Sequence, residues 1–127
     1  MELYTISKPY RSSYYVMHPY TVVFIPEAVE DYKELDGSIK ASIDNKIDEL
    51  GENPFLGERL GNKFNIDLTG FFKIYAYGKK FRIVYRLVTP DRIEIIEVWG
   101  IGKREKEKIY RTIGKRLGKA KRRIVTE

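Results

Sequence analysis

Hydrophobic residues follow a helical spacing through the first part of the chain, after one apolar segment. Residues 20–25 are β-branched and aromatic and end at Pro26, which predicts a strand leading into a helix with proline in its first turn. Apolar positions then recur every three or four residues as far as Leu50, with one interruption at Gly37. This spacing predicts two helices in an αα-hairpin, with its apolar seam in the core and an acidic outer face.

The hydrophobic period changes to two further along the chain. Residues 55–70 have no steady period and contain three glycines, which predicts a connecting loop with one short edge strand. Residues 71–77, 80–88 and 92–99 alternate between apolar and polar positions and predict three antiparallel strands. A last apolar stripe predicts a helix over about residues 105–119.

These elements predict a small α+β domain with the order β-αα-βββ-α. A twisted, mainly antiparallel sheet is expected to pack its apolar face on the helices and to leave its opposite face open. The length of 127 residues fits one domain with a single core. We place this domain at residues 20–119, followed by a frayed basic tail at 120–127. Residues 1–19 form an N-terminal extension, for which an added strand, a docking arm and a disordered lead all stay open.

The distribution of charge narrows the function classes. The net charge is +6, with residues 26–52 mainly acidic and residues 103–123 mainly basic. A basic pole of this kind is typical of nucleic-acid binders, because each neutralised phosphate releases counterions. A solvated, lysine-rich face remains the alternative interpretation.

Composition excludes several kinds of chemistry. The chain has no cysteine and a single histidine, which excludes disulfides, zinc ribbons, thiol nucleophiles and multi-histidine metal sites. We therefore expect neither a metal nor a small-molecule cofactor. No segment approaches the roughly 18 apolar residues of a membrane span, and the first residues lack the pattern of a secretory signal, so we expect a cytoplasmic protein with no membrane partner.

Alternation along the predicted strands gathers cationic and phenolic side chains. Lys73 and Tyr75 share one side of their strand, and Arg82 and Arg86 share one side of the next. On the strands alone, these residues can equally form the polar side of an amphipathic meander.

The segment after the last strand adds Arg104 and Tyr110, at the beginning of the predicted C-terminal helix and two turns into it. Gly100-Ile101-Gly102 is expected to form a tight exit before it. Cleavage of RNA by its 2′-hydroxyl needs a base, stabilisation of the charged phosphorane and a proton for the leaving oxygen. Guanidinium groups suit the second task, and a phenol surrounded by cations can serve as the base. A metal-free, histidine-free ribonuclease is therefore possible with these side chains.

The motifs in this order resemble the RelE/ParE superfamily of type II toxin–antitoxin toxins, and within it the RelE branch, whose members cleave mRNA on the ribosome. The resemblance covers residues 20–117 and rests on N-P-F-L-G-E-R-L-G, L-T-G-F-F-K-I, F-R-I-V-Y and G-K-R-E. It implies that Lys73 binds the RNA backbone and takes part in catalysis, that Arg82 and Arg104 stabilise phosphate, and that Tyr110 is the base.

One position departs from the family pattern. The family's ribosome-dependent nucleases often have a second lysine two residues after the first, where this chain has Tyr75. Tyr75 can mean weaker catalysis, a stacking surface for RNA or another proton-transfer group. The remaining RNA-binding candidates are cationic residues close to the same motifs: Lys79, Lys80, Arg86, Lys103, Lys108 and Arg111.

The resemblance implies an endoribonuclease that inhibits translation, with mRNA and the ribosome as partners. It also implies a short, acidic antitoxin that covers the basic groove or displaces the last helix. Two other functions stay open: a ParE-like toxin that inhibits DNA gyrase without cleaving RNA, and a non-catalytic basic RNA-binding module. The ParE branch generally lacks the paired arginines and the tyrosine, so Arg82, Arg104 and Tyr110 favour RNA cleavage.

Overall fold

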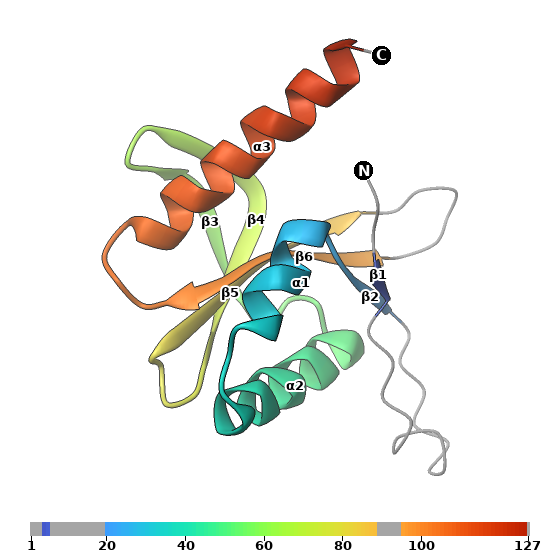
Figure 1. The fold of residues 1–127 in the computed structure, drawn as a ribbon, viewed down its shortest axis with the longest axis vertical. Helices are drawn as coiled ribbons and strands as arrows, with labels where there is room; N and C mark the ends of the chain where they lie inside the picture. The colour runs from blue at the N-terminus through green and yellow to red at the C-terminus, as the bar shows by residue number, and fades with distance from the viewer. Residues whose placement is uncertain (1–3, 6–19, 89–94, 127) are drawn as a thin grey trace.

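The fold is known from a computed structural model that describes residues 4–5, 20–88 and 95–126. The helices are α1 (Pro26–Lys33), α2 (Gly37–Glu52) and α3 (Lys108–Thr126). The strands are β1 (Tyr4–Thr5), β2 (Thr21–Phe24), β3 (Glu58–Lys63), β4 (Ile66–Ala76), β5 (Phe81–Val88) and β6 (Ile95–Lys103). The strands form a six-stranded sheet in the order β1-β2-β6-β5-β4-β3 (Figure 1). Only the β2–β6 pair is parallel among these strands. The predicted α+β class and mainly antiparallel sheet are confirmed.

The helical hairpin follows its sequence signals closely. Pro26 occupies the first turn of α1, and α2 begins at Gly37, where the apolar stripe is interrupted. Ile43, Ile47 and Leu50 of α2 are buried in the core cluster that also holds the strand residues. The predicted αα-hairpin is therefore present with its apolar seam inside.

Residues 55–70 differ from the prediction, because β3 and the first half of β4 form a long hairpin there. The hairpin turns at Phe64 and Asn65, which have φ angles of 52° and 63°. A two-residue turn needs such left-handed conformations, which asparagine tolerates but phenylalanine rarely adopts. Phe64 therefore gives no turn signal in the sequence. A register shift between Arg59 and Gly61 also breaks the period of two. The sequence pattern was therefore too irregular to predict this hairpin.

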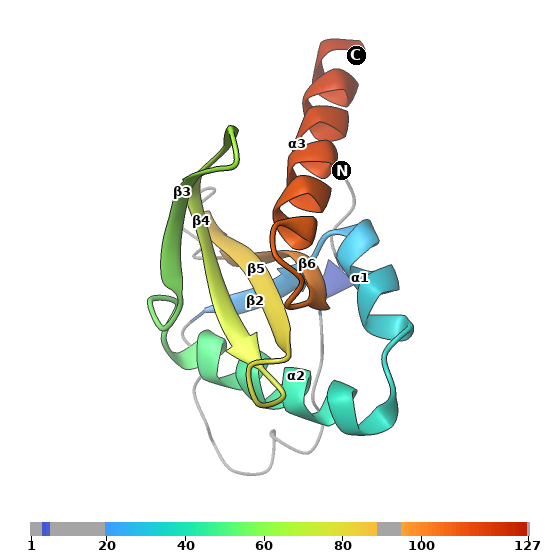
Figure 2. The same ribbon diagram turned by 90° about the vertical axis from the view of Figure 1, so that its left-hand side faces the viewer.

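Helix α3 lies on the sheet face that was expected to stay open. A side chain at Gly100 would come within 2.6 Å of Ile113, and one at Gly102 would come within 3.0 Å of Ile109. These glycines belong to β6 and do not form the expected exit turn. Because they have no side chains, α3 packs closely against their backbone. Figure 2 shows α3 rising beside β4 and β5, with α2 below the sheet.

Both ends of the predicted domain extend further than expected. Tyr4 pairs with Phe24 across the antiparallel β1–β2 ladder, so the described part of the N-terminal extension is an added strand. The rest of that extension, and residues 92–94 of the predicted last strand, lie outside the described residues. Helix α3 begins at Lys108 rather than near residue 105 and continues to Thr126, through the tail expected to fray. Among the described helices, none is long and apolar enough to cross a membrane.

Gly57 packs so closely that a methyl group should disturb the hairpin. A β-carbon there would lie 2.6 Å from the Lys73 carbonyl oxygen and 2.6 Å from the Tyr85 hydroxyl. We expect Gly57→Ala to lower the free energy of unfolding by about 1–3 kcal/mol, measured by urea denaturation, because the backbone at Lys73 must move. Gly37→Ala is the control, since a β-carbon there meets nothing within 4 Å. Equal stability of the two variants would contradict this packing.

Candidate active site

The pairing of the central strands brings the predicted site residues together. Tyr75 of β4 is directly opposite Arg82 of β5, and Arg82 is opposite Gly102 of β6. Paired residues project to the same face of a sheet, so Lys73, Tyr75 and Arg82 lie on one side. Arg104 follows β6 immediately and reaches this group from the other side of Arg82.

Tyr75 is the centre of the cluster. The Lys73 Nζ atom donates a hydrogen bond to the Tyr75 hydroxyl at 2.9 Å and also lies 4.9 Å from the ring centroid. The guanidinium carbons of Arg104 and Arg82 lie 5.2 Å and 5.8 Å from the same centroid. Three cations therefore surround one phenol, and this phenol is itself partly exposed.

Arg82 supports the loop that carries Arg104. Its side chain is only 8% exposed, and its NH1 atom donates to the main-chain carbonyl of Lys106 at 2.8 Å. Its buried Nε has no hydrogen-bond partner among the described residues. Lys106 has a φ of 36°, so the loop turns sharply where Arg82 binds it, and the Arg104 amide donates to the Lys80 carbonyl at 2.8 Å. Arg82 is thus a buried charge that fixes the exposed Arg104.

Tyr110 joins the cluster from α3, which covers the same face of the sheet. It lies in the first turn of α3, is 4% exposed, and stacks on Phe64 with ring centroids 6.2 Å apart. The guanidinium carbon of Arg82 lies 5.2 Å from its ring centroid. The four residues predicted to be catalytic, Lys73, Arg82, Arg104 and Tyr110, therefore converge on one place.

The electrostatics of the Lys73 and Tyr75 pair favour a charged lysine beside an ionisable phenol. The hydrogen bond from Lys73, together with the positive charges of Lys73 and Arg82, lowers the pKa of Tyr75 despite its desolvation. Burial lowers the pKa of Lys73, but the hydrogen bond to Tyr75 and the charges of Tyr110, Tyr75 and Glu58 outweigh it, so the net shift is upward. Glu58 itself is exposed, with its carboxylate 3.6 Å from Nζ.

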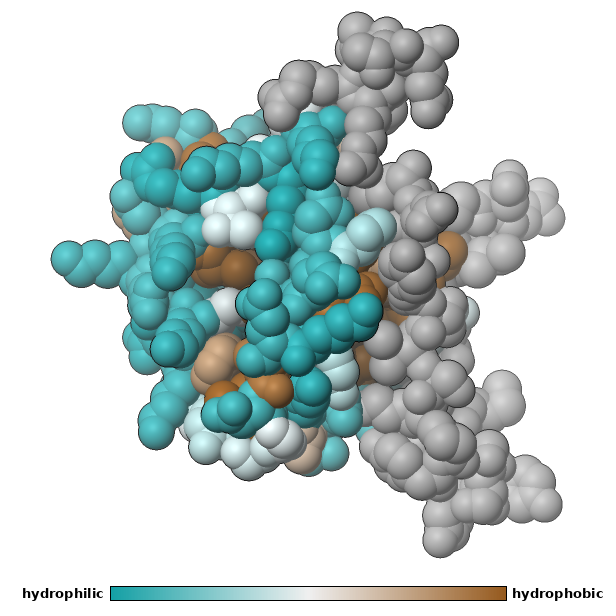
Figure 3. Space-filling model, in the orientation of Figure 1, coloured by the Kyte–Doolittle hydropathy of each residue, from teal (hydrophilic) through white to brown (hydrophobic). Residues whose placement is uncertain are grey.

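Five of the basic residues predicted to bind RNA fall into two groups. Lys79, Lys80 and Lys103 are exposed and line a shallow depression together with Arg104. Lys108 and Arg111 lie on the outer face of α3 and pair with Glu105 at 3.4 Å and Glu107 at 2.7 Å. The face seen in Figure 3 is largely hydrophilic, with apolar residues showing only in small patches. The first group continues the cluster, whereas the second lies apart on α3, where each residue is paired with a glutamate.

Arg86 does not join the cluster, although it shares the strand and the face of Arg82. Its Nε atom donates to the Glu97 carboxylate at 2.6 Å, and its guanidinium carbon lies 4.8 Å from the Trp99 ring centroid. The same Glu97 oxygen accepts a hydrogen bond from the Trp99 indole at 3.0 Å. Arg86 is therefore part of the packing of this end of the sheet, and the candidate site does not include it.

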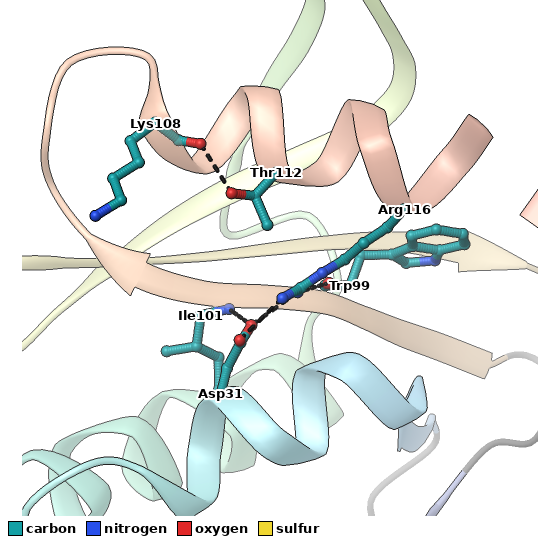
Figure 4. A network of polar contacts seen from close by, with 6 residues as sticks. All are labelled: Asp31, Trp99, Ile101, Lys108, Thr112 and Arg116. Atoms are coloured by element: carbon teal, nitrogen blue, oxygen red, sulfur yellow. Dashed lines mark hydrogen bonds and ion pairs between the residues drawn. The ribbon is translucent and has the colours of Figure 1, made fainter. Parts of the chain in front are cut away.

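A charged clamp holds the helix that carries Tyr110. Arg116 of α3 makes two hydrogen bonds to the Asp31 carboxylate of α1, at 2.7 Å and 2.9 Å, and a third to the Trp99 carbonyl at 2.8 Å. Asp31 also accepts a hydrogen bond from the Ile101 amide at 3.0 Å (Figure 4). The clamp ties α1, β6 and α3 together and so fixes the distance of Tyr110 from the sheet.

Sequence reasoning missed two contributors to the site. Phe64 supports the ring of Tyr110 from the turn of the β3–β4 hairpin, and the Lys106 carbonyl receives Arg82. Neither gives a signal in the sequence, because the first sits in an unpredicted hairpin and the second is a main-chain atom. Within the described part of the chain, no three histidine, aspartate or glutamate side chains gather as metal ligands.

The arrangement suits work on a phosphodiester. Arg104 offers exposed guanidinium donors, the buried charge of Arg82 lies next to them, and Lys73 and Tyr75 share a hydrogen bond that can carry a proton. Positive groups held in place before a charge develops are the usual source of electrostatic stabilisation. The centre can therefore bind an anionic ester and exchange protons with it.

Known proteins are similar to this chain in sequence and fold. Residues 22–108 match the family model described as ParE toxin of type II toxin–antitoxin system, parDE. A RelE-like toxin protein from Escherichia coli is 28% identical over 101 residues, covering 77% of this chain and 97% of the relative. The crystal structure of isolated E. coli RelE toxin superposes with a TM-score of 0.54 at 21% identity, covering 76% of this chain and 96% of RelE. A RelE mutant bound to an antitoxin RelBc peptide superposes with a TM-score of 0.56 at 21% identity, covering 74% and 93% of the two chains. The chain therefore belongs to the ParE toxin family of type II toxin–antitoxin systems, and its fold is that of the RelE toxins.

Proposed function

We propose that this toxin is a ribosome-dependent endoribonuclease that cleaves mRNA and so stops translation in the cytoplasm. The observation that carries the proposal is the convergence of Lys73, Arg82 and Arg104 around Tyr75, with Tyr110 of α3 next to Arg82. A toxin that only binds a protein target does not need a tyrosine hydroxyl hydrogen-bonded to a lysine and surrounded by arginines. Cleavage of RNA by its own 2′-hydroxyl can use such a set as base, acid and charge stabiliser.

The reaction assigns each cation a task. Arg104, which is exposed, binds the non-bridging oxygens of the scissile phosphate, and Arg82 adds its charge from beneath and keeps the Arg104 loop in place. One of the two tyrosines, Tyr75 or Tyr110, acts as phenolate and takes the proton of the 2′-hydroxyl, which attacks phosphorus as the bond to the 5′-oxygen breaks. Lys73 donates a proton to that oxygen. The products are a 2′,3′-cyclic phosphate and a 5′-hydroxyl end, and no metal takes part.

The surrounding basic surface binds the RNA backbone. Lys79, Lys80 and Lys103 continue the positive charge beyond Arg104 along the depression, where they can neutralise phosphates on either side of the cut. Lys108 and Arg111 face outward on α3 and suit docking to ribosomal RNA. Tyr75, partly exposed, presents a ring to the RNA at the centre.

An acidic antitoxin is the proposed protein partner. The matching family model is that of a toxin from a type II toxin–antitoxin system, and a structural neighbour is the E. coli RelE mutant with its RelBc antitoxin peptide. The net charge of +6 and the exposed lysines that line the depression beside Arg104 favour an acidic segment that covers the cluster or displaces α3.

Inhibition of DNA gyrase is the second candidate function, because the matching family model is named for ParE. That function predicts DNA damage with intact mRNA, and it gives the Lys73, Tyr75 and Arg104 cluster no task.

Expression of the toxin without a partner separates the two functions. We expect growth arrest with shortened mRNA, and we expect Arg104→Ala to relieve it, because loss of one charge stabiliser lowers the cleavage rate by about 10²-fold. Lys46→Ala, a lysine on α2 paired with Glu49, is the control and should stay toxic. Undiminished toxicity of Arg104→Ala, or arrest with intact mRNA and damaged DNA, would remove the nuclease proposal.

A further inference from the structure

Two phenols compete for the role of base, and they differ in their surroundings. Tyr110 is 4% exposed and packs between the ring of Phe64 and the guanidinium of Arg82. Tyr75 is partly exposed, and its hydroxyl has a hydrogen bond to Lys73 of 2.9 Å. A base must reach the proton that it removes, so the accessible phenol is the better placed of the two.

We propose that Tyr75 is the catalytic base and that Lys73 and Tyr75 form a proton-relay pair, with Tyr110 as a positioning residue for Arg82. This inference rests on the proposed nuclease function and goes further, because it assigns the proton path to a residue that replaces the second lysine of the family pattern.

The position of Tyr75 supports the assignment. It lies opposite Arg82 in the β4–β5 ladder, and its ring is within 6 Å of the cationic groups of Lys73, Arg82 and Arg104. A phosphate bound by the exposed Arg104 is therefore next to the Tyr75 hydroxyl. The same cations stabilise the phenolate form that a base requires.

The proton balance closes within the pair. The Tyr75 phenolate takes the proton of the 2′-hydroxyl, the 2′-oxygen forms a bond to phosphorus, and the bond from phosphorus to the 5′-oxygen breaks. The Lys73 ammonium gives a proton to that 5′-oxygen and becomes an amine. The Tyr75 hydroxyl then returns its proton to Lys73 across their hydrogen bond, which restores both groups for the next substrate.

The direction of the pKa shifts agrees with this cycle. The hydrogen bond from Lys73 and the surrounding positive charge lower the pKa of Tyr75, so a larger fraction is phenolate at a given pH. The pKa of Lys73 is raised on balance, so the ammonium persists through the same range. Cleavage should therefore rise with pH while Tyr75 loses its proton and should fall only once Lys73 loses its own.

The pH dependence of single-turnover cleavage on programmed ribosomes tests the assignment. The wild-type toxin is measured first, and absence of cleavage there counts against the nuclease proposal itself. We expect Tyr75→Phe to cleave about 10²-fold more slowly and to lose the rise with pH, because only the hydroxyl is removed. Tyr110→Phe should keep the rise, and Tyr77→Phe, an exposed neighbour outside the cluster, should match wild type. Loss of the rise in Tyr110→Phe, with Tyr75→Phe unchanged, would overturn the inference.

A substrate with sulfur in place of the 5′-oxygen separates the two members of the pair. A thiolate leaves without a proton, so this substrate should restore cleavage by Lys73→Met, which lacks the acid. It should not restore cleavage by Tyr75→Phe, which lacks the base. Rescue of Tyr75→Phe would make Tyr75 the acid and contradict the relay. Thermal unfolding of each variant shows whether a loss of activity reflects a loss of fold.

Discussion

Arg82→Ala is expected to lower single-turnover cleavage on the order of 10³-fold, at the upper end of the effect of losing one electrostatic stabiliser. The change removes a cation near Tyr75 and Tyr110, and it also removes the hydrogen bond that holds the Lys106 carbonyl. Arg104 lies in the same loop as Lys106, so its guanidinium should lose its fixed position as well. The measurement is the cleavage rate of purified toxin at saturating ribosome concentration.

Arg86→Ala is the matched control for this prediction. Arg86 lies on the same strand and the same face, but it binds Glu97 and packs on Trp99 away from the cluster. We expect the variant to unfold at a lower temperature, because Glu97 is 7% exposed and loses its ion-pair partner, yet to cleave at the wild-type rate while folded. A loss of cleavage as large as that of Arg82→Ala would contradict the separation of the two arginines.

Asp31→Ala is expected to cost about 3 kcal/mol of unfolding free energy, because removing one partner of a largely buried ion pair leaves the other charge without compensation. The Asp31 and Arg116 side chains are 20% and 15% exposed, and the Ile101 amide loses its acceptor too. Urea denaturation measures the loss. Since Arg116 anchors α3, cleavage should fall together with stability (Figure 4).

Glu30→Ala on the same helix controls for the loss of an acidic side chain. Glu30 pairs with Lys33 at 3.5 Å, but both side chains are mostly exposed. An exposed pair of this kind contributes about 0.5 kcal/mol or less. If Asp31→Ala were as mild as Glu30→Ala, the clamp would not be what holds α3 on the sheet.

Periodic patterns were enough to predict most of the fold. The stripe through Ile43 and Leu50 and the alternation on either side of Gly78 each describe one buried face, so the helices and the central strands were found. The β3–β4 hairpin was missed, because its bulge before Gly61 interrupts the alternation and its turn uses Phe64 at positive φ. Long-range packing, rather than the local sequence pattern, determines the conformation of such a segment.

The main error in the sequence-based prediction of the site was the position of α3, because the sheet face that it covers was expected to stay open. The amphipathic pattern of a helix indicates that the helix packs, but not on which face of the sheet. Gly100 and Gly102 were interpreted as a turn, whereas α3 packs against them. Because α3 covers that face, Tyr110 and Arg82 are buried rather than displayed. The convergence of the cationic groups could be predicted from strand alternation and the family resemblance, whereas the burial that distinguishes Tyr75 from Tyr110 could not.

Mapping of RNA ends decides whether this toxin cleaves mRNA by attack of the 2′-hydroxyl. Purified toxin is mixed with ribosomes that carry a defined mRNA, and the chemical ends of the fragments are determined. We predict cuts within the ribosomal decoding site that leave 2′,3′-cyclic phosphate and 5′-hydroxyl ends, and we predict their loss when Lys73, Arg82 and Arg104 are replaced together. Intact mRNA with the wild-type toxin, or the same cuts from the triple variant, would contradict this mechanism.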